Sequence, residues 1–440
     1  MKVVVIGGSA AGMSFAAKYK RNQPSDEVIV LDKRSYISFG ACGLPYFAGG
    51  MFNDTERMIS RTPEQAIKSG LDVRVETEMV SFDRTEKHIT VRHKNVESTI
   101  DYDMLVIATG ARPIVPSFDE FNPEHVYTLT SMEDGLAVKE ALKDDRKQRV
   151  CVIGAGFIGL EVFDAAHGLD KHVTIIEREQ HIMSRQFSSE IIEVVEGAIR
   201  ESGADLKTGC SVSAIRDADQ GGYIVETDNG NVEADIVILS LGFKPNTEAF
   251  ELPKAANGAL LVNEYGATED AYIHAVGDCA VVHHMALGKP VYVPLATTAN
   301  KQARMMADKL AGKDTYMSGF LGSSCLKVLD YELACTGVNE LLAKEHNLDV
   351  KVSTISDKNQ TDYYPGQEDI KVKLVYHPET NVLLGGEIVG KKGAVGRINA
   401  LAVVITAKMT TQQLGYMDFC YAPPFSRTWD ALNVAGNVAK

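Results

Sequence analysis

A single cysteine, Cys42, stands in a short segment of mostly small residues, 38–46, with the sequence SFGACGLPY. The next cysteine along the chain is Cys151, so Cys42 has no close neighbour in sequence with which to form a disulfide. A cysteine becomes a good nucleophile when its surroundings lower its pKa, and a helix N-terminus or a flavin environment could do so here. Taken alone, such a residue is equally consistent with a small buried hydrophobic side chain. The motifs on either side of it favour a redox role.

A glycine-rich loop farther along the chain has the spacing of a dinucleotide-binding site. It carries Gly154, Gly156 and Gly159 after an apolar run at 150–153, and Glu177 ends the next apolar run. The first glycine allows a tight turn, the second lets the backbone approach a pyrophosphate, and the third allows close packing of helix on strand. Glu177 can accept hydrogen bonds from a ribose diol and would repel a 2′-phosphate, which favours NADH. The adjacent Arg178 keeps NADPH possible.

The N-terminal loop is a less regular version of the same pattern. It carries Gly7 and Gly12, but Ser9 stands where the second glycine is usual, and Asp32 follows Gly12 by 20 residues. On its own this pattern is more typical of a plain tight turn between strand and helix. Asp278 favours a flavin site instead of a plain turn, because it ends a later buried run and could hold the sugar-alcohol chain of FAD. We therefore predict a flavin site made from two separate parts of the chain, and two nucleotide sites with one thiol between them indicate electron transfer from a nicotinamide through a flavin to sulfur.

Length and composition disfavour several classes of protein. A chain of 440 residues exceeds what one hydrophobic core usually supports, so two or three domains are expected. The formal charge of −14 argues against binding to nucleic acid or to an anionic membrane. We expect no secretory signal and no membrane span, since no run approaches about 18 apolar residues. The seven cysteines are scattered without metal-type spacing, which predicts no metal site and a reducing, cytoplasmic location.

The pattern of strand, glycine turn, helix and strand at residues 2–32 recurs at 149–177. Its unbroken apolar runs are typical of parallel strands that are buried on both faces. Segments 101–110 and 234–242 also resemble each other, and each is expected to close its nucleotide domain. From about residue 320, alternating strands and an amphipathic helix near 395–408 predict a separate α+β domain.

The ordered set of motifs resembles the pyridine nucleotide–disulfide oxidoreductase family over essentially the whole chain. It comprises the two glycine loops, the ATG segment at 108–110, Glu161 and the pair Gly277-Asp278. In that family the flavin lies between the nicotinamide and a redox thiol. Members with two cysteines separate them by four residues, but positions 37 and 47 here are isoleucine and phenylalanine. The segment around Cys42 instead looks like the single-cysteine branch, which includes coenzyme A disulfide reductases, persulfide reductases, NADH oxidases and NADH peroxidases.

The resemblance implies an α/β protein with two interleaved Rossmann-like domains, for FAD and NAD(P), plus an α+β C-terminal dimerisation domain. The expected FAD-binding domain comprises residues 1–112 and 245–318. The NAD(P)H-binding domain is expected at 113–244 and the dimerisation domain at 319–440.

The resemblance also implies the cofactor contacts. FAD would be bound by residues of the N-terminal loop and of later segments, namely Gly7, Ser9, Ala10, Gly12, Asp32, Lys33, Ala108, Thr109, Gly110, Asp278 and Ala296. NADH, or NADPH, would lie along Gly154, Gly156, Phe157, Ile158, Gly159, Glu161 and Glu177. Phe157 falls where the family gates the nicotinamide pocket, and Glu161 falls where an acid approaches the flavin edge.

Two features point to the coenzyme A disulfide reductases within this branch. Oxidases and peroxidases typically carry a histidine in the first glycine loop, where this chain has Ala10. The segments YYPG at 363–366 and YAPP at 421–424 resemble segments of the reductases' C-terminal domain. The resemblance implies that Tyr363 and Tyr421 reach across a homodimer to the partner's Cys42, although interface aromatics beside turn prolines would give the same pattern. Ala41 departs from the asparagine that often precedes the cysteine in these reductases.

Three further residues fall where the branch binds its substrate. Arg21 and Arg61 lie where the phosphates of coenzyme A are held, and Ser38 opens the cysteine segment. Arginine suits bidentate contacts to phosphate, whereas each of these arginines taken alone is more often a solvated surface charge.

The sequence thus predicts a homodimeric flavoprotein that passes electrons from NAD(P)H through FAD to Cys42 and on to a coenzyme A disulfide or persulfide. The catalytic residues would be Cys42, Tyr363 and Tyr421. Two alternatives stay open: an NADH oxidase or peroxidase that cycles Cys42 through a sulfenic acid, and a redox-sensing flavoprotein without turnover.

Overall fold

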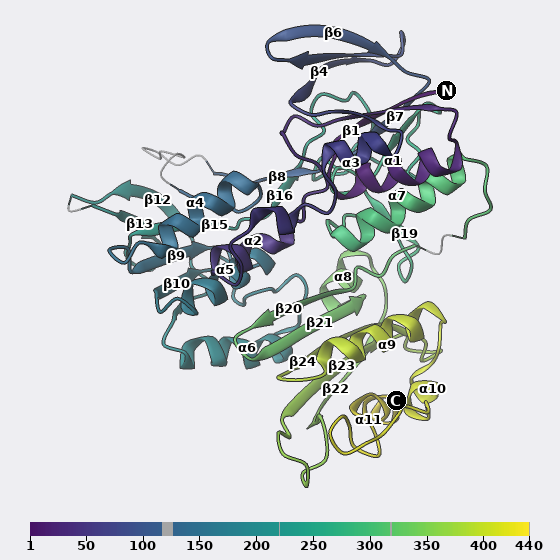
Figure 1. Ribbon diagram of the computed structural model, residues 1–440. Coiled ribbons are helices and arrows are strands. Elements are labelled where there is room, and N and C mark those ends of the chain that lie inside the picture. Colours follow the sequence, from purple (N-terminus) through teal and green to yellow (C-terminus); the bar gives the residue numbers. More distant parts are fainter. Residues whose placement is uncertain (117–125, 220, 317–318, 440) are drawn as a thin grey trace.

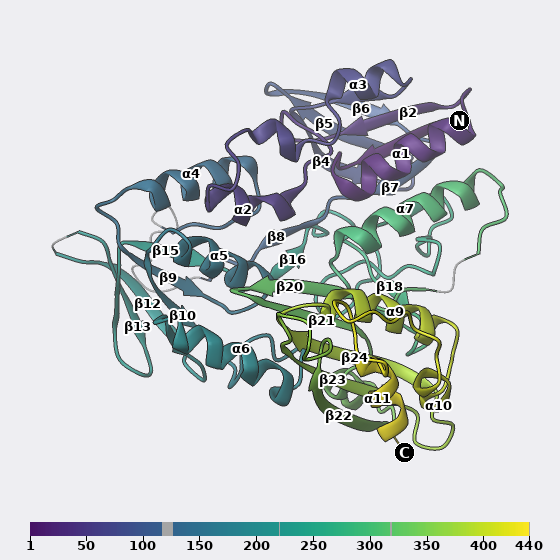
Figure 2. The ribbon, with the colours of Figure 1, turned by 60° about the horizontal axis from the view of Figure 1, so that its bottom comes forward.

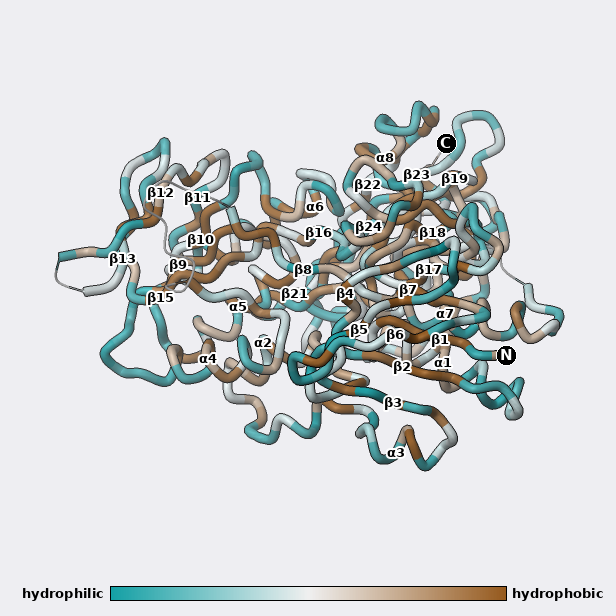
Figure 3. The backbone as a smooth tube through the Cα atoms, turned by 90° about the horizontal axis from the view of Figure 1, so that it is seen from above, coloured by the Kyte–Doolittle hydropathy of each residue, from teal (hydrophilic) through white to brown (hydrophobic). Residues whose placement is uncertain are grey.

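The computed structural model describes residues 1–116, 126–219, 221–316 and 319–439, and it confirms the α/β class (Figure 1). Two parallel sheets each form the centre of one unit, and a third, antiparallel sheet lies in the C-terminal part of the chain. The strands of both parallel sheets are largely hydrophobic, as the sequence predicts (Figure 3).

The first parallel sheet has helices on one face and a small antiparallel sheet on the other. Its strands run in the order β17 (Ile273–Ala275), β7 (Met104–Ile107), β1 (Lys2–Ile6), β2 (Glu27–Leu31) and β3 (Asp72–Arg74). Alternate residues of β1 enter different cores: Val3 and Val5 pack with α1 (Ala10–Asn22) and α7 (Ala296–Leu310), and Val4 packs on the opposite side. The opposite face is covered by β4 (Thr77–Asp83), β5 (His88–His93) and β6 (Val96–Asp101).

The second parallel sheet repeats this arrangement. Its strand order is β11 (Asp205–Lys207), β10 (His172–Ile176), β9 (Arg149–Ile153) and β15 (Ile236–Leu239). One face packs on α5 (Phe157–His167) and the other on the antiparallel strands β12 (Val212–Asp217), β13 (Tyr223–Thr227) and β14 (Val232–Ala234). The recurrence predicted from the sequence at 149–177 is therefore a recurrence of structure.

The chain passes between the two units through a pair of short antiparallel strands, β8 (Ala111–Pro113) and β16 (Phe243–Pro245). Beside this pair, Thr109 Oγ1 donates to the carbonyl of Asn246 over 2.6 Å, and Asn246 Nδ2 donates to the carbonyl of Thr109 over 3.0 Å. After β16 the chain returns to the first sheet, where β17 pairs with β7. The interleaving is thus confirmed: segment 101–110 supplies β7, and the strand at the edge of the sheet, β17, comes from the part of the chain that returns. In the second sheet, β15 forms an edge.

The C-terminal sheet packs against helices of its own part of the chain and against a helix of the second unit. Its antiparallel order is β20 (Ser324–Val328), β21 (Tyr331–Gly337), β24 (Leu383–Gly390), β23 (Asp369–Tyr376) and β22 (Lys351–Lys358). Helices α9 (Ala394–Thr406) and α11 (Ala431–Val438) contact this sheet, and α6 (Ser189–Glu201) of the second unit also packs on it. Between α6 and this sheet, Lys373 is buried and pairs with Glu190 over 2.6 Å, and it also pairs with Glu340.

The remaining elements are short connections. They are α3 (Pro63–Lys68), α4 (Met132–Lys143), α8 (Glu340–Glu345), α10 (Thr411–Gly415), β18 (Val282–His284), β19 (Lys289–Val291), and the 3-10 turns η1 (Ala41–Gly43) and η2 (Thr55–Met58). Within the described ranges, every helix is too short or too polar to cross a membrane.

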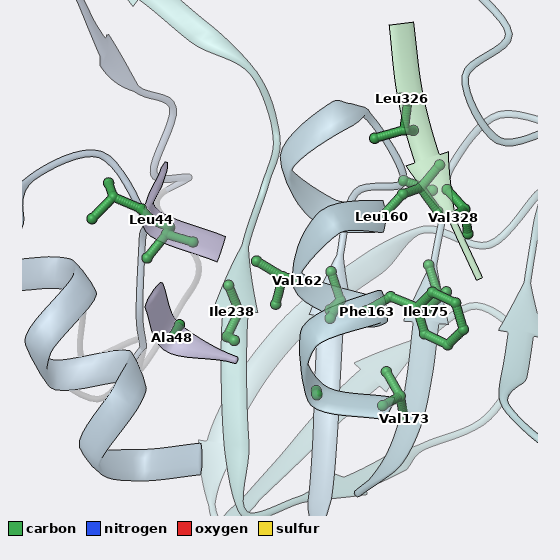
Figure 4. Packing of buried hydrophobic residues seen from close by; sticks show 14 of the residues in the cluster. Leu44, Ala48, Leu160, Val162, Phe163, Val173, Ile175, Ile238, Leu326 and Val328 are labelled. Carbon is green, nitrogen blue, oxygen red and sulfur yellow. The ribbon is translucent and has the colours of Figure 1, made fainter. Parts of the chain in front are cut away.

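The helix that follows Cys42, α2 (Leu44–Ala48), belongs to the first unit in sequence but packs on α4 and α5 of the second (Figure 2). Leu44 is fully buried, and its side chain lies so close to Gly135 of α4 that a Cβ atom there would come within 2.5 Å of it. In Figure 4, Leu44 and Ala48 lie on one side of α5, and Leu326 and Val328 of β20 lie on the other. One hydrophobic core thus fixes the Cys42 segment, the second unit and the C-terminal sheet together.

Phe163 is the largest side chain of α5 in this core and is fully inaccessible to solvent. Replacement by alanine (Phe163→Ala) should destabilise the fold by about 3–5 kcal/mol, because it removes buried apolar area and leaves a cavity. Chemical unfolding followed by circular dichroism would measure the change. Val96, which is 69% exposed on β6, provides a control, since Val96→Ala should leave the midpoint nearly unchanged. Equal midpoints for both variants would contradict the role assigned to this core.

Candidate active site

One large cleft of about 2360 Å³ opens between the two nucleotide units and the start of β20. Most of the residues predicted as site residues line it: Gly7, Ser9, Ala10, Arg21, Asp32, Lys33, Ser38, Cys42, Arg61, Ala108, Thr109, Gly110, Gly154, Gly156, Phe157, Ile158, Glu161, Glu177, Asp278 and Ala296. Four predicted residues do not line it: Gly12, Gly159, Tyr363 and Tyr421.

The glycines of the two loops have matching roles in the backbone. Gly7 and Gly154 have φ values of +107° and +98°, and a Cβ atom on either would overlap the carbonyl of the strand segment alongside. Gly12 and Gly159 face back onto the first glycine of their own loop, where a side chain would overlap its carbonyl oxygen. These two residues therefore act in helix–strand packing, which explains why they do not reach the cleft.

The second position of each loop forms the N-cap of the following helix. Gly156 precedes α5 with open space where a side chain would stand. Ser9 precedes α1, but its hydroxyl donates to the carbonyl of Phe39 over 3.3 Å and makes no cap bond. The amides at both helix starts thus remain available to an anion such as a pyrophosphate. A serine at this position is compatible with that arrangement.

The two acids at the strand ends make equivalent contacts. Asp32 Oδ2 accepts the amide of Gly8 over 2.8 Å, and Glu177 Oε2 accepts the amide of Ala155 over 2.8 Å. Each carboxylate therefore lies against its own glycine loop. Asp32 differs in one respect, since it also forms an ion pair with Arg34 over 2.9 Å.

Asp278 enters the cleft from the loop after β17. Gly277 has a φ of +82°, and a Cβ atom there would lie 2.8 Å from that of Ala11 on α1, so the loop and the helix approach closely. Burial raises the pKa of Asp278 to about 6. A carboxyl group held in this way can accept hydrogen bonds from hydroxyl groups of a bound molecule.

Cys42 lies in η1 and its side chain is open to the cleft. The pKa of its thiol is raised, first by the loss of water around it and then by the carboxylates of Glu161 and Asp278. The helix after Cys42 has only five residues, and two acids face the thiol, so the chain's own groups favour the protonated form.

Glu161 on α5 is the second titratable group beside Cys42. Burial raises its pKa to about 7, and the hydroxyl of Tyr46 donates to its Oε1 over 3.3 Å. The pKa of Tyr46 is itself raised to about 12, mainly by burial. Tyr46 was part of the cysteine segment in the sequence, but its contact with Glu161 spans 115 positions and could not be read from spacing.

The predicted substrate residues line the cleft, together with residues that the sequence did not single out. Arg21 and Arg61 come from α1 and from the loop before α3, and Ser38 has a φ of +52°. Asn300 and Arg304 line the same cleft one turn apart on α7. Their spacing of four residues on one helix is the signal that could have revealed them.

Tyr363 and Tyr421 lie on the surface of the C-terminal part. Their hydroxyl groups are hydrogen-bonded to each other over 2.7 Å, and the two side chains are 70% and 43% exposed. The bond to Tyr363 raises the pKa of Tyr421. The segments YYPG at 363–366 and YAPP at 421–424, which lie apart in the sequence, are therefore in contact within one chain.

Among the described residues, no group of histidine, cysteine, aspartate and glutamate side chains is arranged to hold a metal ion. His283 and His284 form part of the β18–β19 hairpin. Cys210 and Cys325 also line the cleft, and neither was singled out from the sequence; Cys325, at the start of β20, is exposed and Cys210 is buried.

Comparison with known proteins decides the family. The pyridine nucleotide-disulphide oxidoreductase family matches residues 1–303, and its dimerisation domain matches residues 323–432. The chain belongs to this family. It is 35% identical to an NAD(P)H sulfur oxidoreductase (CoA-dependent) of Pyrococcus abyssi, over 100% of this chain and 98% of that protein. It is 31% identical to an NADH oxidase of Enterococcus faecalis, over 100% of this chain and 99% of that protein.

The fold has a close counterpart of known structure. The NAD-dependent persulfide reductase from A. fulgidus superimposes with a TM-score of 0.95 at 34% identity, over 100% of this chain and 83% of that chain. The predicted family is thus confirmed across both nucleotide units and the C-terminal part.

Replacing Glu161 by glutamine should lower the pKa of the Cys42 thiol, because it removes the nearer source of negative charge. The rate at which iodoacetamide alkylates Cys42, followed by peptide mass spectrometry over a range of pH, would report the change. The profile of Glu161→Gln should move to lower pH, whereas Glu201→Gln, at the exposed end of α6 and outside the cleft, should leave it in place. A profile unchanged by Glu161→Gln would show that this carboxylate does not act on the thiol.

Proposed function

We propose that the protein is an FAD-dependent reductase that uses NAD(P)H to reduce a disulfide or persulfide of coenzyme A at Cys42. The observation that carries the proposal is that the exposed, unpaired thiol of Cys42 opens into the cleft that both glycine loops line. Similarity to a CoA-dependent sulfur oxidoreductase and to a persulfide reductase supports the same substrate class.

The first unit fits FAD. The start of α1 leaves its amides open to a pyrophosphate, and Asp278 offers a partly buried carboxyl group to hydroxyl groups of the cofactor. We assign residues 1–112 and 245–318 to FAD binding, 113–244 to NAD(P)H binding and 319–440 to dimerisation. When bound, FAD supplies a ring that takes hydride from the nicotinamide and passes the electron pair on to sulfur.

The sulfur of Cys42 performs the exchange with substrate. Its thiolate attacks one sulfur of the disulfide, forms a mixed disulfide and releases one coenzyme A thiolate. The electron pair from NAD(P)H then cleaves the mixed disulfide and releases the second thiolate. The sum is NAD(P)H + H⁺ + RSSR → NAD(P)⁺ + 2 RSH, and for a persulfide the products are RSH and H₂S.

Basic side chains that line the cleft suit the phosphates of coenzyme A. Arg21, Arg61 and Arg304 line it from three separate elements. Ser38 also lines the cleft, four residues before Cys42. Guanidinium groups can bind phosphate through two parallel hydrogen bonds, which would orient the thiol end of the substrate toward Cys42.

A homodimer completes this proposal. The dimerisation-domain match covers residues 323–432, and the Tyr363–Tyr421 pair is exposed within it. In our proposal these phenols lie beside the partner's Cys42 and give a hydrogen bond to a departing thiolate.

Glu177 favours NADH as the electron donor, and the adjacent Arg178 leaves NADPH possible. The free cysteines suit a location in the reducing cytoplasm.

An NADH oxidase is the second candidate, favoured by similarity to the Enterococcus faecalis enzyme. In that reaction Cys42 would cycle through a sulfenic acid. Ala10 in the first glycine loop argues against it, because no histidine is present there to assist oxygen chemistry.

Replacing Cys42 by serine should abolish the predicted activity. NADH oxidation driven by coenzyme A disulfide, measured without oxygen, should fall roughly 10³-fold or more, because a hydroxyl cannot replace a thiolate in disulfide exchange. Transfer from NADH to an artificial dye should remain, since it does not require the sulfur.

Cys420→Ser provides the control, because Cys420 is another exposed thiol that lies outside the cleft. Rapid oxygen consumption by the unmodified protein with no response to coenzyme A disulfide would favour the oxidase instead.

A further inference from the structure

Glu161 lines two cavities. One is the large cleft with Cys42, and the other is a separate cavity of about 120 Å³ between α2, α5 and β20. Tyr46, Asp164 and Lys327 also line this second cavity. Glu161 is therefore the residue that borders both spaces.

Polar groups continue from Glu161 to the surface through the second cavity. The hydroxyl of Tyr46 contacts Glu161 Oε1 over 3.3 Å, and Asp164 lies one helical turn farther along α5. Asp164 pairs with Lys327 over 3.4 Å, and the side chain of Lys327 is 59% exposed. The rim also includes Met51, which is 70% exposed, so the cavity is bordered by solvent-accessible residues.

The reaction proposed above needs such a connection. NAD(P)H brings two electrons and one proton as hydride, whereas two thiols leave with two protons. The second proton comes from solvent, while the bound cofactors and substrate fill the large cleft during the reaction. A path that enters from the other side of Glu161 would supply it without opening the cleft.

We propose that Glu161 delivers this proton to a thiolate in the cleft and recovers it from solvent through Tyr46 and the second cavity. In the delivery step the carboxylic acid of Glu161 gives up its proton and the thiolate becomes a thiol. In the recovery step Tyr46 passes a proton to the carboxylate as its hydroxyl takes another from water in the cavity. This inference rests on the proposed function.

The titratable groups that face Glu161 suit this role. Cys42 faces it from η1, Cys325 from β20, Tyr46 from α2 and Asp164 from α5. Burial and the charge of Asp164 raise the pKa of Glu161 to about 7, so it is partly protonated at neutral pH. Tyr46, with a pKa of about 12, stays protonated and can donate and accept at once.

The test compares Glu161→Gln and Tyr46→Phe with Tyr19→Phe in the FAD-loaded dimer. Tyr19 is a matched control, because its hydroxyl also donates to a carboxylate, Asp26, over 2.9 Å, and it lines neither cavity. Flavin reduction by NADH should be the same in Tyr46→Phe and Tyr19→Phe, since it takes no proton from solvent. Turnover and proton uptake, followed with an indicator dye, should fall about 10²-fold in Glu161→Gln and less in Tyr46→Phe.

The pH profile distinguishes this role from a structural one. The rate of the unmodified enzyme should fall as pH rises through about 7, because Glu161 loses the proton that it delivers. This limb should disappear in Glu161→Gln and remain in Tyr19→Phe. If Tyr46→Phe and Glu161→Gln take up protons as fast as Tyr19→Phe, the proton path is wrong.

Infrared difference spectroscopy provides a readout that needs no turnover. A carboxylic-acid band that titrates at about pH 7 should be lost in Glu161→Gln, and its exchange in D₂O should slow in Tyr46→Phe but not in Tyr19→Phe. This holds whichever sulfur or oxygen compound is the acceptor, so failure of the proposed substrate is separable from failure of the path. A band that does not respond to Tyr46→Phe would overturn the inference.

Discussion

The arrangement of the cleft depends on the packing of α2 against the second unit. Leu44 and Phe47 are fully buried there, and Gly135 of α4 leaves room for the Leu44 side chain. Lys139 of α4 strengthens the same contact, since its ammonium lies 3.9 Å from the ring of Phe47 and donates to the carbonyl of Phe52 over 2.7 Å. Because η1 leads directly into α2, this packing fixes Cys42 over the groove between two domains that are separated in sequence.

The two nucleotide units form the same arrangement of glycine loop and strand-end acid with different residues. In both, a glycine with positive φ turns the chain away from its strand, and an acid at the end of the next strand accepts an amide of the loop. The difference lies in the partner of the acid, since Asp32 is paired with Arg34 whereas the neighbouring Arg178 pairs with Glu179. Equal backbones thus leave the two carboxylates with different surroundings, which is how one fold can hold two different dinucleotides.

Local patterns in the sequence were enough to predict the parts of the fold that depend on backbone geometry. The loops at Gly7 and Gly154 are short-range features, and each glycine is required by a close approach within its own unit. The strands β4–β6 and β12–β14 escaped prediction because most of their residues are partly buried or exposed and form no distinctive motif. The contact of Tyr46 with Glu161 was not predicted for another reason. This contact depends on how α2 packs against α5, which follows from packing across the whole core.

The same long-range packing explains why the charge around Cys42 differs from what its motif suggests. A motif shows that a thiol is present, but its ionisation depends on groups that the fold brings from α5 and from the loop after β17. Glu161 and Asp278 both disfavour a thiolate, and burial disfavours the ionised form of all three groups. The chain's own groups therefore favour the protonated forms of Cys42, Glu161 and Asp278. A positive charge placed in the cleft would act on the same thiol in the opposite direction, because an opposite charge favours the ionised form.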